Sequence, residues 1–328
     1  MADKIMGALS ILMFVSTWIS SLLSPFLLLR ALYKGQYVWA NIIIGITLVA
    51  YAPGDQKGPM AQEFHKFVWY YFPRYFQSLT VEYEGGIPPK KNSDDTSTPA
   101  SNQQQQQPQQ QTFYAIHPHG AFSFGWATLF CHPDLEQVRF CFAPALYASP
   151  FFRLFSRSTG TPGSASKSEM IRYMKLGNDI ALPPGGFEEA TLTSPNHDRV
   201  FIKKRIGFVK LCLQHGLAIR PVYCFGEKAL YWNLQGGFDF RINVLNKNGL
   251  PAIVTWGHPL IPLLPRSNVD MKIVVGAPMV MPKIEDPTNE VVKQWHDKYM
   301  AALTKLFEDH KESYYGPEIA KTTKLELW

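Results

Sequence analysis

Residues 112–126 read TFYAIHPHGAFSFGW and join a strand to an abrupt turn. The run Phe113 to Ile116 is β-branched and aromatic, which predicts a strand. The strand must end at His117-Pro118-His119-Gly120, because proline cannot donate to a sheet ladder and glycine permits angles that other residues avoid. Two imidazoles therefore stand at the carboxyl end of a strand, where open α/β sheets place their chemistry. Taken alone, such a pair also fits a surface turn or half of a metal site.

The composition indicates a lipid contact or an unusually large core. Of 328 residues, 46% are hydrophobic and only 18% are charged. The net charge of +6 favours an anionic partner such as acidic headgroups or coenzyme A, and the sequence has no zinc-finger spacing or basic-aromatic module for nucleic acid. The four cysteines are scattered, which is typical of reduced thiols facing the cytosol.

Two apolar runs open the chain. Ile5 to Leu29 is long enough to cross ~30 Å of hydrocarbon, and it is longer than the core of a signal peptide and lacks a clean cleavage site. Tyr37 to Ala52 is shorter, which fits a tight second span or a re-entrant segment. We expect a membrane hairpin with both chain ends on one side; one embedded hydrophobic loop is the alternative. Basic residues at 57, 66 and 74 follow the second run and favour the cytosolic side.

Composition divides the chain into four parts. Residues 1–56 form the hairpin, and residues 57–87 hold an amphipathic helix at Ala61 to Phe76 and a first strand. The helix suits either the catalytic core or the membrane interface. Residues 88–111 are a glutamine-rich tract with little to bury, so we expect a disordered insertion. Residues 112–328 form the catalytic domain.

Strands and helices alternate after the histidine motif, which indicates an α/β fold. Ser166, with Glu169 three residues later, predicts a capping box at the start of one helix. The other expected elements are strands at 138–143, 179–182, 218–225, 253–256 and 271–276, and helices at 150–157, 208–215 and 287–312.

Further polar motifs follow other predicted strands. Gly185 and Gly186 allow a close backbone approach, and their N–H groups suit an oxyanion or a phosphate. Two carboxylates, Glu188 and Glu189, come directly afterwards. Glu227 ends another strand, where it would either line the site or cap a neighbouring element.

A basic cluster surrounds the start of the next predicted helix. It comprises Arg199, Lys203, Lys204, Arg205 and Lys210. A solvated surface explains most such runs, whereas an acyl-CoA substrate needs cations and a helix N-terminus for its phosphates.

Several motifs occur together in one order. They are Tyr71-Phe72-Pro73, His117-Pro118-His119-Gly120, Gly185-Gly186-Phe187-Glu188-Glu189, and the block from Arg205-Ile206-Gly207-Phe208 to Phe225-Gly226-Glu227. Through these motifs and their order, the chain resembles the type-2 diacylglycerol acyltransferase family, which includes monoacylglycerol and wax-ester acyltransferases. The resemblance implies a mixed sheet with flanking helices, similar to glycerolipid acyltransferases, plus the N-terminal hairpin. It also makes Tyr71-Phe72-Pro73 a positioning element.

The resemblance implies transfer of a fatty acyl group from acyl-CoA to a neutral lipid, with diacylglycerol as first choice. His119 is then the general base, and His117 orients the loop or polarises the acyl carbonyl. Related enzymes orient the base with an Asp in His-x-x-x-x-Asp, but Phe122 and Phe124 stand at those offsets here. Glu189 would therefore orient the imidazole, while Glu188 occupies a variable position.

The same resemblance implies the binding partners. Gly185, Gly186, Lys203, Lys204 and Arg205 would hold acyl-CoA, a co-substrate, and no permanently bound cofactor or metal is expected. Diacylglycerol and membrane lipid are the other partners, nucleic acid is not, and a homo-oligomer is left open. The expected location is the endoplasmic reticulum membrane with the catalytic domain in the cytosol, and lipid droplets.

Rival functions remain at this point. A hydrolase or thioesterase would use water as the acceptor, although the sequence has no Gly-x-Ser-x-Gly elbow for the serine version. A non-catalytic hairpin protein of lipid droplets would leave the ordered motifs unexplained. Monoacylglycerol and long-chain alcohols are alternative acceptors.

Overall fold

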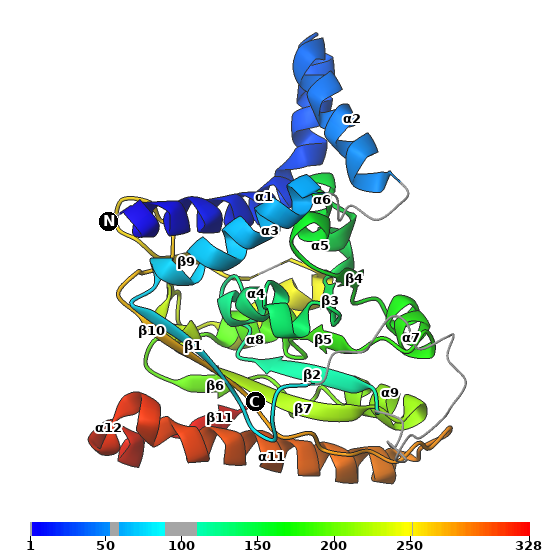
Figure 1. Cartoon of the computed structure of the whole chain (residues 1–328), viewed down its shortest axis with the longest axis vertical. Helices are drawn as coiled ribbons and strands as arrows, with labels where there is room; N and C mark the ends of the chain where they lie inside the picture. Colours follow the sequence, from blue (N-terminus) through cyan, green and yellow to red (C-terminus); the bar gives the residue numbers. More distant parts are fainter. Residues whose placement is uncertain (1, 53–58, 89–109, 251) are drawn as a thin grey trace, which may run out of the picture.

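The computed structural model describes residues 2–52, 59–88, 110–250 and 252–328. A central sheet lies between two layers of helices, and two N-terminal helices project from one end of the molecule (Figure 1). This arrangement confirms the predicted α/β fold with a mixed sheet and flanking helices. The expected disordered insertion lies almost wholly outside the described residues.

Within the described residues, seven strands form the main sheet in the order β1-β10-β7-β2-β5-β3-β4. Their bounds are β1 Ser78–Tyr83, β2 Thr112–His117, β3 Arg139–Phe142, β4 Pro162–Ser164, β5 Ile180–Leu182, β7 Ala218–Phe225 and β10 Asp270–Val275. Strands β1 and β10 run against the other five, since β10 pairs with β7 antiparallel. The neighbours β7, β2 and β5 are parallel, so their carboxyl ends meet at one edge of the sheet.

Helices cover both faces of this sheet. One face carries α3 (Pro59–Tyr71), α4 (Phe124–Phe130), α5 (Pro144–Ala148) and α6 (Pro150–Thr159) together with the start of α1; the other carries α7 (Lys167–Lys175), α9 (Gly207–His215) and α11 (Asn289–Tyr315). Strands β2 and β7 are buried at every residue, because both of their faces are covered.

Shorter elements surround the core. They are the 3₁₀ turn η1 (Pro73–Tyr75), α8 (Gly186–Leu192), β6 (Asp198–Val200), β8 (Trp232–Asn233), α10 (Phe238–Phe240), β9 (Thr255–Trp256), α12 (Pro317–Thr322) and β11 (Leu325–Leu327). Strand β11 pairs with β6 and β8 pairs with β9, each pair outside the main sheet. The strand predicted at 253–256 is shorter in the structure. Only Thr255–Trp256 form a strand, β9, and it pairs with β8 in a separate two-stranded sheet.

The first apolar run does not form one straight segment directed away from the domain. Helix α1 (Ala2–Tyr33) bends near Pro25, and its first half lies along the catalytic domain (Figure 1). By length and composition Ala2–Ser21 could cross a membrane, yet Ile11, Phe14 and Val15 are buried in the core that includes α3, α4 and α6. The projecting hairpin consists of the apolar helices Leu23–Tyr33 and α2 (Tyr37–Tyr51). That Ile5 to Leu29 crosses the bilayer stays a prediction; in the structure this run is bent, and one side of its first half packs against the domain.

Two local predictions also need correction. Helix α7 begins after Ser166, but no side-chain hydrogen bond from this serine caps it, and Glu169 pairs with Arg172 instead. At the end of the glutamine-rich tract, Gln110 and Gln111 belong to the ordered structure. Their side-chain amides donate to backbone carbonyls of neighbouring elements at 2.8–3.0 Å, which fixes the entry into β2.

Candidate active site

The edge where β7, β2 and β5 end holds the residues that the motifs predict. His117 is the last residue of β2, Gly185 and Gly186 follow β5, and Glu227 follows β7 (Figure 1). Three separate motifs therefore meet because three parallel neighbours end together. The meeting point is buried: His117 and Glu189 have no exposed surface, and His119 is 7% exposed.

Both ring nitrogens of His117 are occupied by protein groups. Its Nδ1 lies 3.0 Å from both carboxylate oxygens of Glu189, and its Nε2 lies 3.0 Å from the hydroxyl of Tyr299 in α11. Burial holds the pKa of Tyr299 well above its usual value, so the phenol stays neutral and donates to Nε2. Nδ1–H then donates to Glu189. Both nitrogens of His117 are thus engaged within the protein in this arrangement.

His119 is arranged differently. Its Nδ1 lies 2.9 Å from the carbonyl oxygen of Gly120 and 3.1 Å from Oγ of Ser123. A carbonyl only accepts, so Nδ1 carries the proton and Nε2 keeps its lone pair. Among the described residues no protein group bonds that Nε2. Burial lowers the pKa of His119, which keeps the imidazole neutral and able to act as a base.

Glu189 does not orient the imidazole of His119, contrary to expectation. Its Oε1 accepts from the backbone N–H of His119 at 2.7 Å, while its contact with a ring is to His117. Its Oε2 accepts from the backbone N–H of Phe201 at 2.8 Å. The ring of His119 instead contacts Gly120 and Ser123 through Nδ1. Glu189 thus fixes the backbone of the loop that carries His119, and the catalytic roles of both residues stay predictions.

Glu227 caps a neighbouring helix. Its two carboxyl oxygens accept from the N–H groups of Phe124 and Gly125, at the start of α4, at 3.0 and 2.7 Å. Burial raises its pKa to about 8 despite these two donors. Gly120 (φ +63°) lies against the same carboxyl group, because a Cβ there would sit 2.2 Å from its Oε1. Of the two roles left open by the sequence, the structure therefore shows capping.

The predicted acyl-CoA residues are only partly available. Arg205 forms an ion pair with Glu188 and donates to the carbonyl of Gly185 at 3.2 Å, which ties the basic cluster to the Gly185-Gly186 turn. Lys203 and Lys204 are exposed beside the N-terminus of α9. The two lysines are exposed, whereas the arginine is partly buried, and their role in binding acyl-CoA stays a prediction.

An aromatic wall separates the site from the projecting hairpin. Phe122, in the loop after the histidine motif, packs against Trp18 of α1 with ring centroids 5.9 Å apart and against Tyr231 at 5.4 Å. Phe72 of the Tyr71-Phe72-Pro73 motif packs on Phe124 at 5.8 Å. These contacts surround the loop after the histidine motif with aromatic rings.

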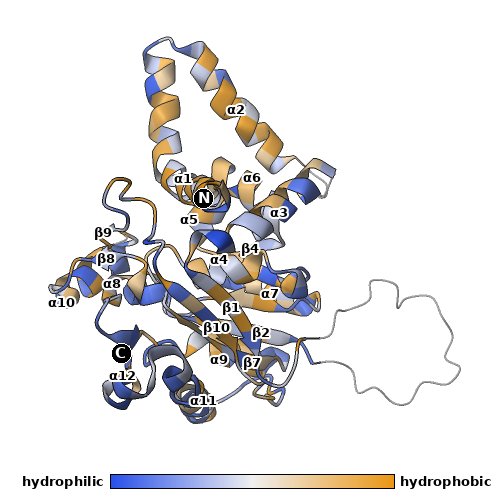
Figure 2. Ribbon diagram, turned by 60° about the vertical axis from the view of Figure 1, so that its left-hand side comes forward, coloured by the Kyte–Doolittle hydropathy of each residue, from blue (hydrophilic) through white to orange (hydrophobic). Residues whose placement is uncertain are grey.

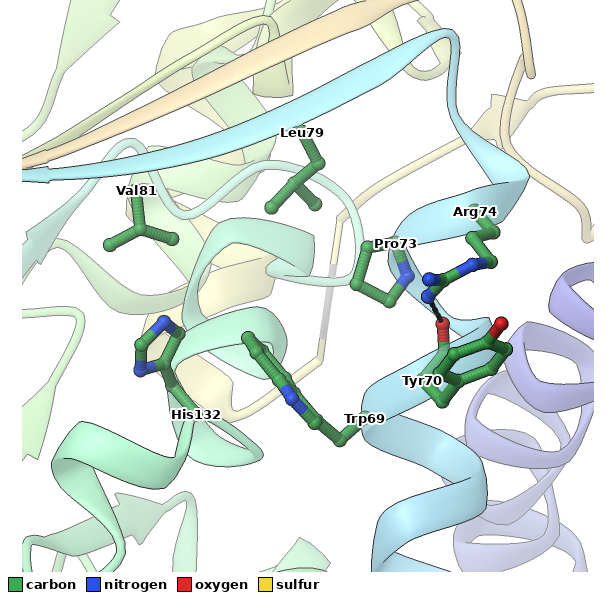
Figure 3. A pocket seen from close by; sticks show the side chains of 7 residues that line it. All are labelled: Trp69, Tyr70, Pro73, Arg74, Leu79, Val81 and His132. Atoms are coloured by element: carbon green, nitrogen blue, oxygen red, sulfur yellow. Dashed lines mark hydrogen bonds between the residues drawn. The ribbon is translucent and has the colours of Figure 1, made fainter.

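A hollow lies away from these residues. It measures about 400 Å³ and lies between α3, η1, β1 and the loop after α4 (Figure 3). Its wall consists of Trp69, Tyr70, Pro73, Arg74, Leu79, Val81 and His132. None of these residues contributes a bond to the histidine motif or to Glu189.

Sequence reasoning missed three contributors to the site. Tyr299 lies in a predicted amphipathic helix, where a polar residue on the buried face was the available signal. Ser123 carried no signal except its place in the quoted stretch. Residues 325–328 carried no signal in the sequence. The carbonyl of Trp328 accepts from the N–H groups of Ile202 at 2.9 Å and Lys203 at 2.7 Å. These two residues directly follow Phe201, which donates to Glu189.

Comparisons with known proteins identify the family of the chain. Residues 100–328 match the model of the diacylglycerol acyltransferase family. The chain is 33% identical to human acyl-CoA wax alcohol acyltransferase 2 over 239 residues, which is 64% of this chain and 68% of that protein. It is 33% identical to diacylglycerol O-acyltransferase 2 of Dictyostelium discoideum, covering 61% and 66%, and 36% identical to that of Mus musculus, covering 62% and 58%.

A solved structure also shows some similarity. The 1-acyl-sn-glycerophosphate acyltransferase of Thermotoga maritima aligns with 87% of this chain and 95% of its own, at 14% identity and a TM-score of 0.40. The family match covers most of the chain and includes the histidine motif, Glu189, Glu227 and Tyr299. This protein is therefore a member of the diacylglycerol acyltransferase family.

Proposed function

We propose that the protein transfers a fatty acyl group from acyl-CoA to the free hydroxyl of diacylglycerol and so forms triacylglycerol. The observation that carries the proposal is the 2.9 Å contact between Nδ1 of His119 and the carbonyl oxygen of Gly120, from which we infer that the ring proton is on Nδ1. The lone pair on Nε2 is left to accept a proton. A base of this kind suits an alcohol that attacks an activated thioester near pH 7.

In the proposed reaction, Nε2 of His119 removes the hydroxyl proton as the alcohol oxygen attacks the thioester carbonyl. The carbon–oxygen bond forms, the carbon–sulfur bond breaks, and the imidazolium returns its proton to the departing coenzyme A thiolate. No protein nucleophile is needed, because the acyl group arrives activated. Consistent with this, burial raises the pKa of all four cysteine thiols.

Lys203 and Lys204 are the proposed contacts for the phosphates of coenzyme A. They are exposed, and the N-terminus of α9 adds unpaired backbone N–H groups beside them. Arg205 is already paired with Glu188, so we assign it to holding the Gly185-Gly186 turn. Lys203→Ala should therefore raise KM for acyl-CoA more than it lowers kcat.

A long-chain alcohol is the second candidate acceptor, because one relative is a wax alcohol acyltransferase. The hairpin would keep either acceptor close, and we propose that it anchors the enzyme in the endoplasmic reticulum membrane or on lipid droplets. The catalytic domain would then face the cytosolic acyl-CoA pool.

An acceptor panel tests the function. Purified protein in lipid vesicles receives labelled acyl-CoA with diacylglycerol, monoacylglycerol, hexadecanol or no acceptor, and the labelled products are separated. Labelled triacylglycerol in excess over all other products is the expected result. Wax ester as the main product would favour the second candidate, and free fatty acid without any ester would identify a thioesterase.

A further inference from the structure

A second exposed apolar surface lies outside the hairpin. It occupies the loop that follows β9, in a stretch from Ala252 to Pro265 that contains no Asp, Glu, Lys or Arg. Leu260 is 86% exposed, and Trp256, Ile261 and Leu263 are exposed as well. We call residues 256–263 the apolar tip. Contiguous exposed apolar residues of this kind mark a contact surface rather than ordinary surface variation.

The backbone holds the apolar tip away from the domain. Gly257 N–H donates to the carbonyl of Pro262 at 2.9 Å, and His258 N–H donates to that of Leu264 at 2.7 Å. Gly257 is required for this closure, since a Cβ there would sit 1.9 Å from the carbonyl oxygen of Leu264. The side chain of Leu264 is buried, whereas that of Leu260 is exposed. The loop is thus closed on itself and cannot fold its apolar side chains back onto the protein.

The base of the apolar tip is also fixed to the core. The hydroxyl of Tyr231 donates to the carbonyl of Leu263 at 2.6 Å, and the hydroxyl of Tyr75 donates to that of Pro265 at 2.6 Å. Tyr231 packs in turn on Phe122 of the catalytic loop. A rigid connection of a few residues therefore joins the apolar tip to the loop that carries His119.

The position of the apolar tip suggests what covers it. Both views place this loop beside the first half of α1, at the end of the molecule from which the hairpin projects (Figures 1 and 2). That half of α1 exposes Ile5, Leu9 and Met13 at a spacing of four, while its opposite side is buried in the core. Three apolar surfaces thus lie at the same end: the hairpin, this stripe of α1 and the apolar tip.

Two tryptophans lie at the base of the apolar tip. Trp232 of β8 and Trp256 of β9 lie opposite each other in the antiparallel pair β8-β9, and both are exposed. Tryptophan is enriched where a protein passes from water into a membrane, because its ring is apolar and its N–H is polar.

We infer that the apolar tip inserts into the same bilayer leaflet as the hairpin, so that the catalytic domain docks on the membrane through a broad face. The inference rests on the proposed membrane role of the hairpin. The first half of α1 would lie along the surface with its stripe toward lipid, and the apolar tip would enter beside it. The hairpin supplies the anchor, and the apolar tip fixes the orientation of the domain above the leaflet that holds the acceptor.

A single-cysteine probe tests the insertion in the full-length protein. The four native cysteines are buried, so a cysteine at Leu260→Cys can be labelled selectively with an environment-sensitive fluorophore. After reconstitution into phosphatidylcholine vesicles, its emission should shift to shorter wavelength and be quenched by lipids with a spin label on the acyl chain. Gly45→Cys in the hairpin is the control for insertion, and Lys321→Cys in α12 is the control for solvent.

Two results would overturn the inference. A probe at 260 that behaves like the one at 321 would mean that the tip stays in water. A wavelength shift without quenching by lipid would assign the surface to a protein contact, such as a second copy of the chain. Neither result depends on catalysis, so the test remains valid if the proposed reaction is incorrect.

A pair of charge variants supplies the functional measurement. Leu260→Asp combined with Ile261→Asp should raise KM for a long-chain acceptor in vesicles several-fold and leave turnover of a short-chain acceptor in detergent unchanged. Leu176→Asp, an exposed leucine at the end of α7, is the matched control and should affect neither. Equal behaviour of the double variant and the control would contradict the inference.

Discussion

The backbone of Gly185 lies so close to Glu189 that a Cβ added to the glycine would sit 2.1 Å from Oε2 and 2.5 Å from Cβ of the glutamate. Glycine is therefore required at this position for a packing reason. A methyl group must displace the carboxylate that holds the ring of His117 and the backbone of His119.

Gly185→Ala should reduce kcat by about 10²-fold, the scale expected when a catalytic loop is misplaced by ~1 Å. Steady-state kinetics on purified protein provide the measurement. Gly45→Ala in α2 is the matched control, because a Cβ there meets nothing within 4 Å, and its activity should stay close to that of the parent.

Substitution of the two histidines should affect kcat and Tm differently. His119→Ala removes the proposed base and should cost ~10²–10⁴-fold in kcat with little change in Tm. His117→Ala should lower both kcat and Tm, because it leaves Glu189 and the Tyr299 hydroxyl buried without their partner. Activity assays paired with thermal unfolding in detergent separate the cases, and an active His119→Ala variant would place the chemistry elsewhere.

Glu189→Gln should be far more damaging than Glu188→Gln. The carboxylate of Glu189 accepts from His117, His119 and Phe201, and an amide would turn its NH₂ toward one of these donors. Each hydrogen bond to a buried charge contributes about 1.5–3 kcal/mol, so both Tm and kcat should fall. Glu188 pairs with Arg205 near the surface, and its loss should change kcat less than about tenfold. Similar values for the two variants would contradict this assignment.

The buried carboxyl group of Glu227 predicts a pH dependence of stability. Its pKa rises from 4.5 in the unfolded chain to about 8 in the folded protein, so the folded state binds the extra proton between these values. Its contribution to the free energy of unfolding is full below pH 4.5 and is lost as the pH rises through 8, at up to about 1.4 kcal/mol per unit. Thermal unfolding of the parent and of Glu227→Gln across this pH window checks the prediction. The Tm of the parent should fall relative to the Tm of the variant as the pH rises. A constant difference would contradict the raised pKa.

The hairpin should enter one leaflet without crossing the bilayer. Its second helix, α2, has 15 residues and is about 22 Å long, and the arm Leu23–Tyr33 is shorter, whereas the hydrocarbon core is ~30 Å thick. In sealed microsomes, a membrane-impermeant maleimide added to either side should fail to label Gln36→Cys at the turn. Labelling from the lumen would show that the hairpin crosses, and tags at both chain ends should remain accessible from the cytosol.

The sheet edge that carries the site could be predicted from the sequence, because each strand ends at a glycine or proline followed by polar residues. The partners of those residues could not be predicted. Tyr299 lies 182 positions from His117, and no periodicity relates a helix residue to a strand end at that separation. The first half of α1 could not be placed either, since an uncharged apolar helix suits a protein core as well as lipid.

The short strand β11 has a consequence for the order of events in the cell. Residues 325–328 pair with the segment 198–203, which includes the N–H group that bonds Glu189. They are translated after every other residue that builds the site. Until these residues emerge, the N–H groups of Ile202 and Lys203 lack the carbonyl of Trp328, and the neighbouring backbone that donates to Glu189 lacks this support.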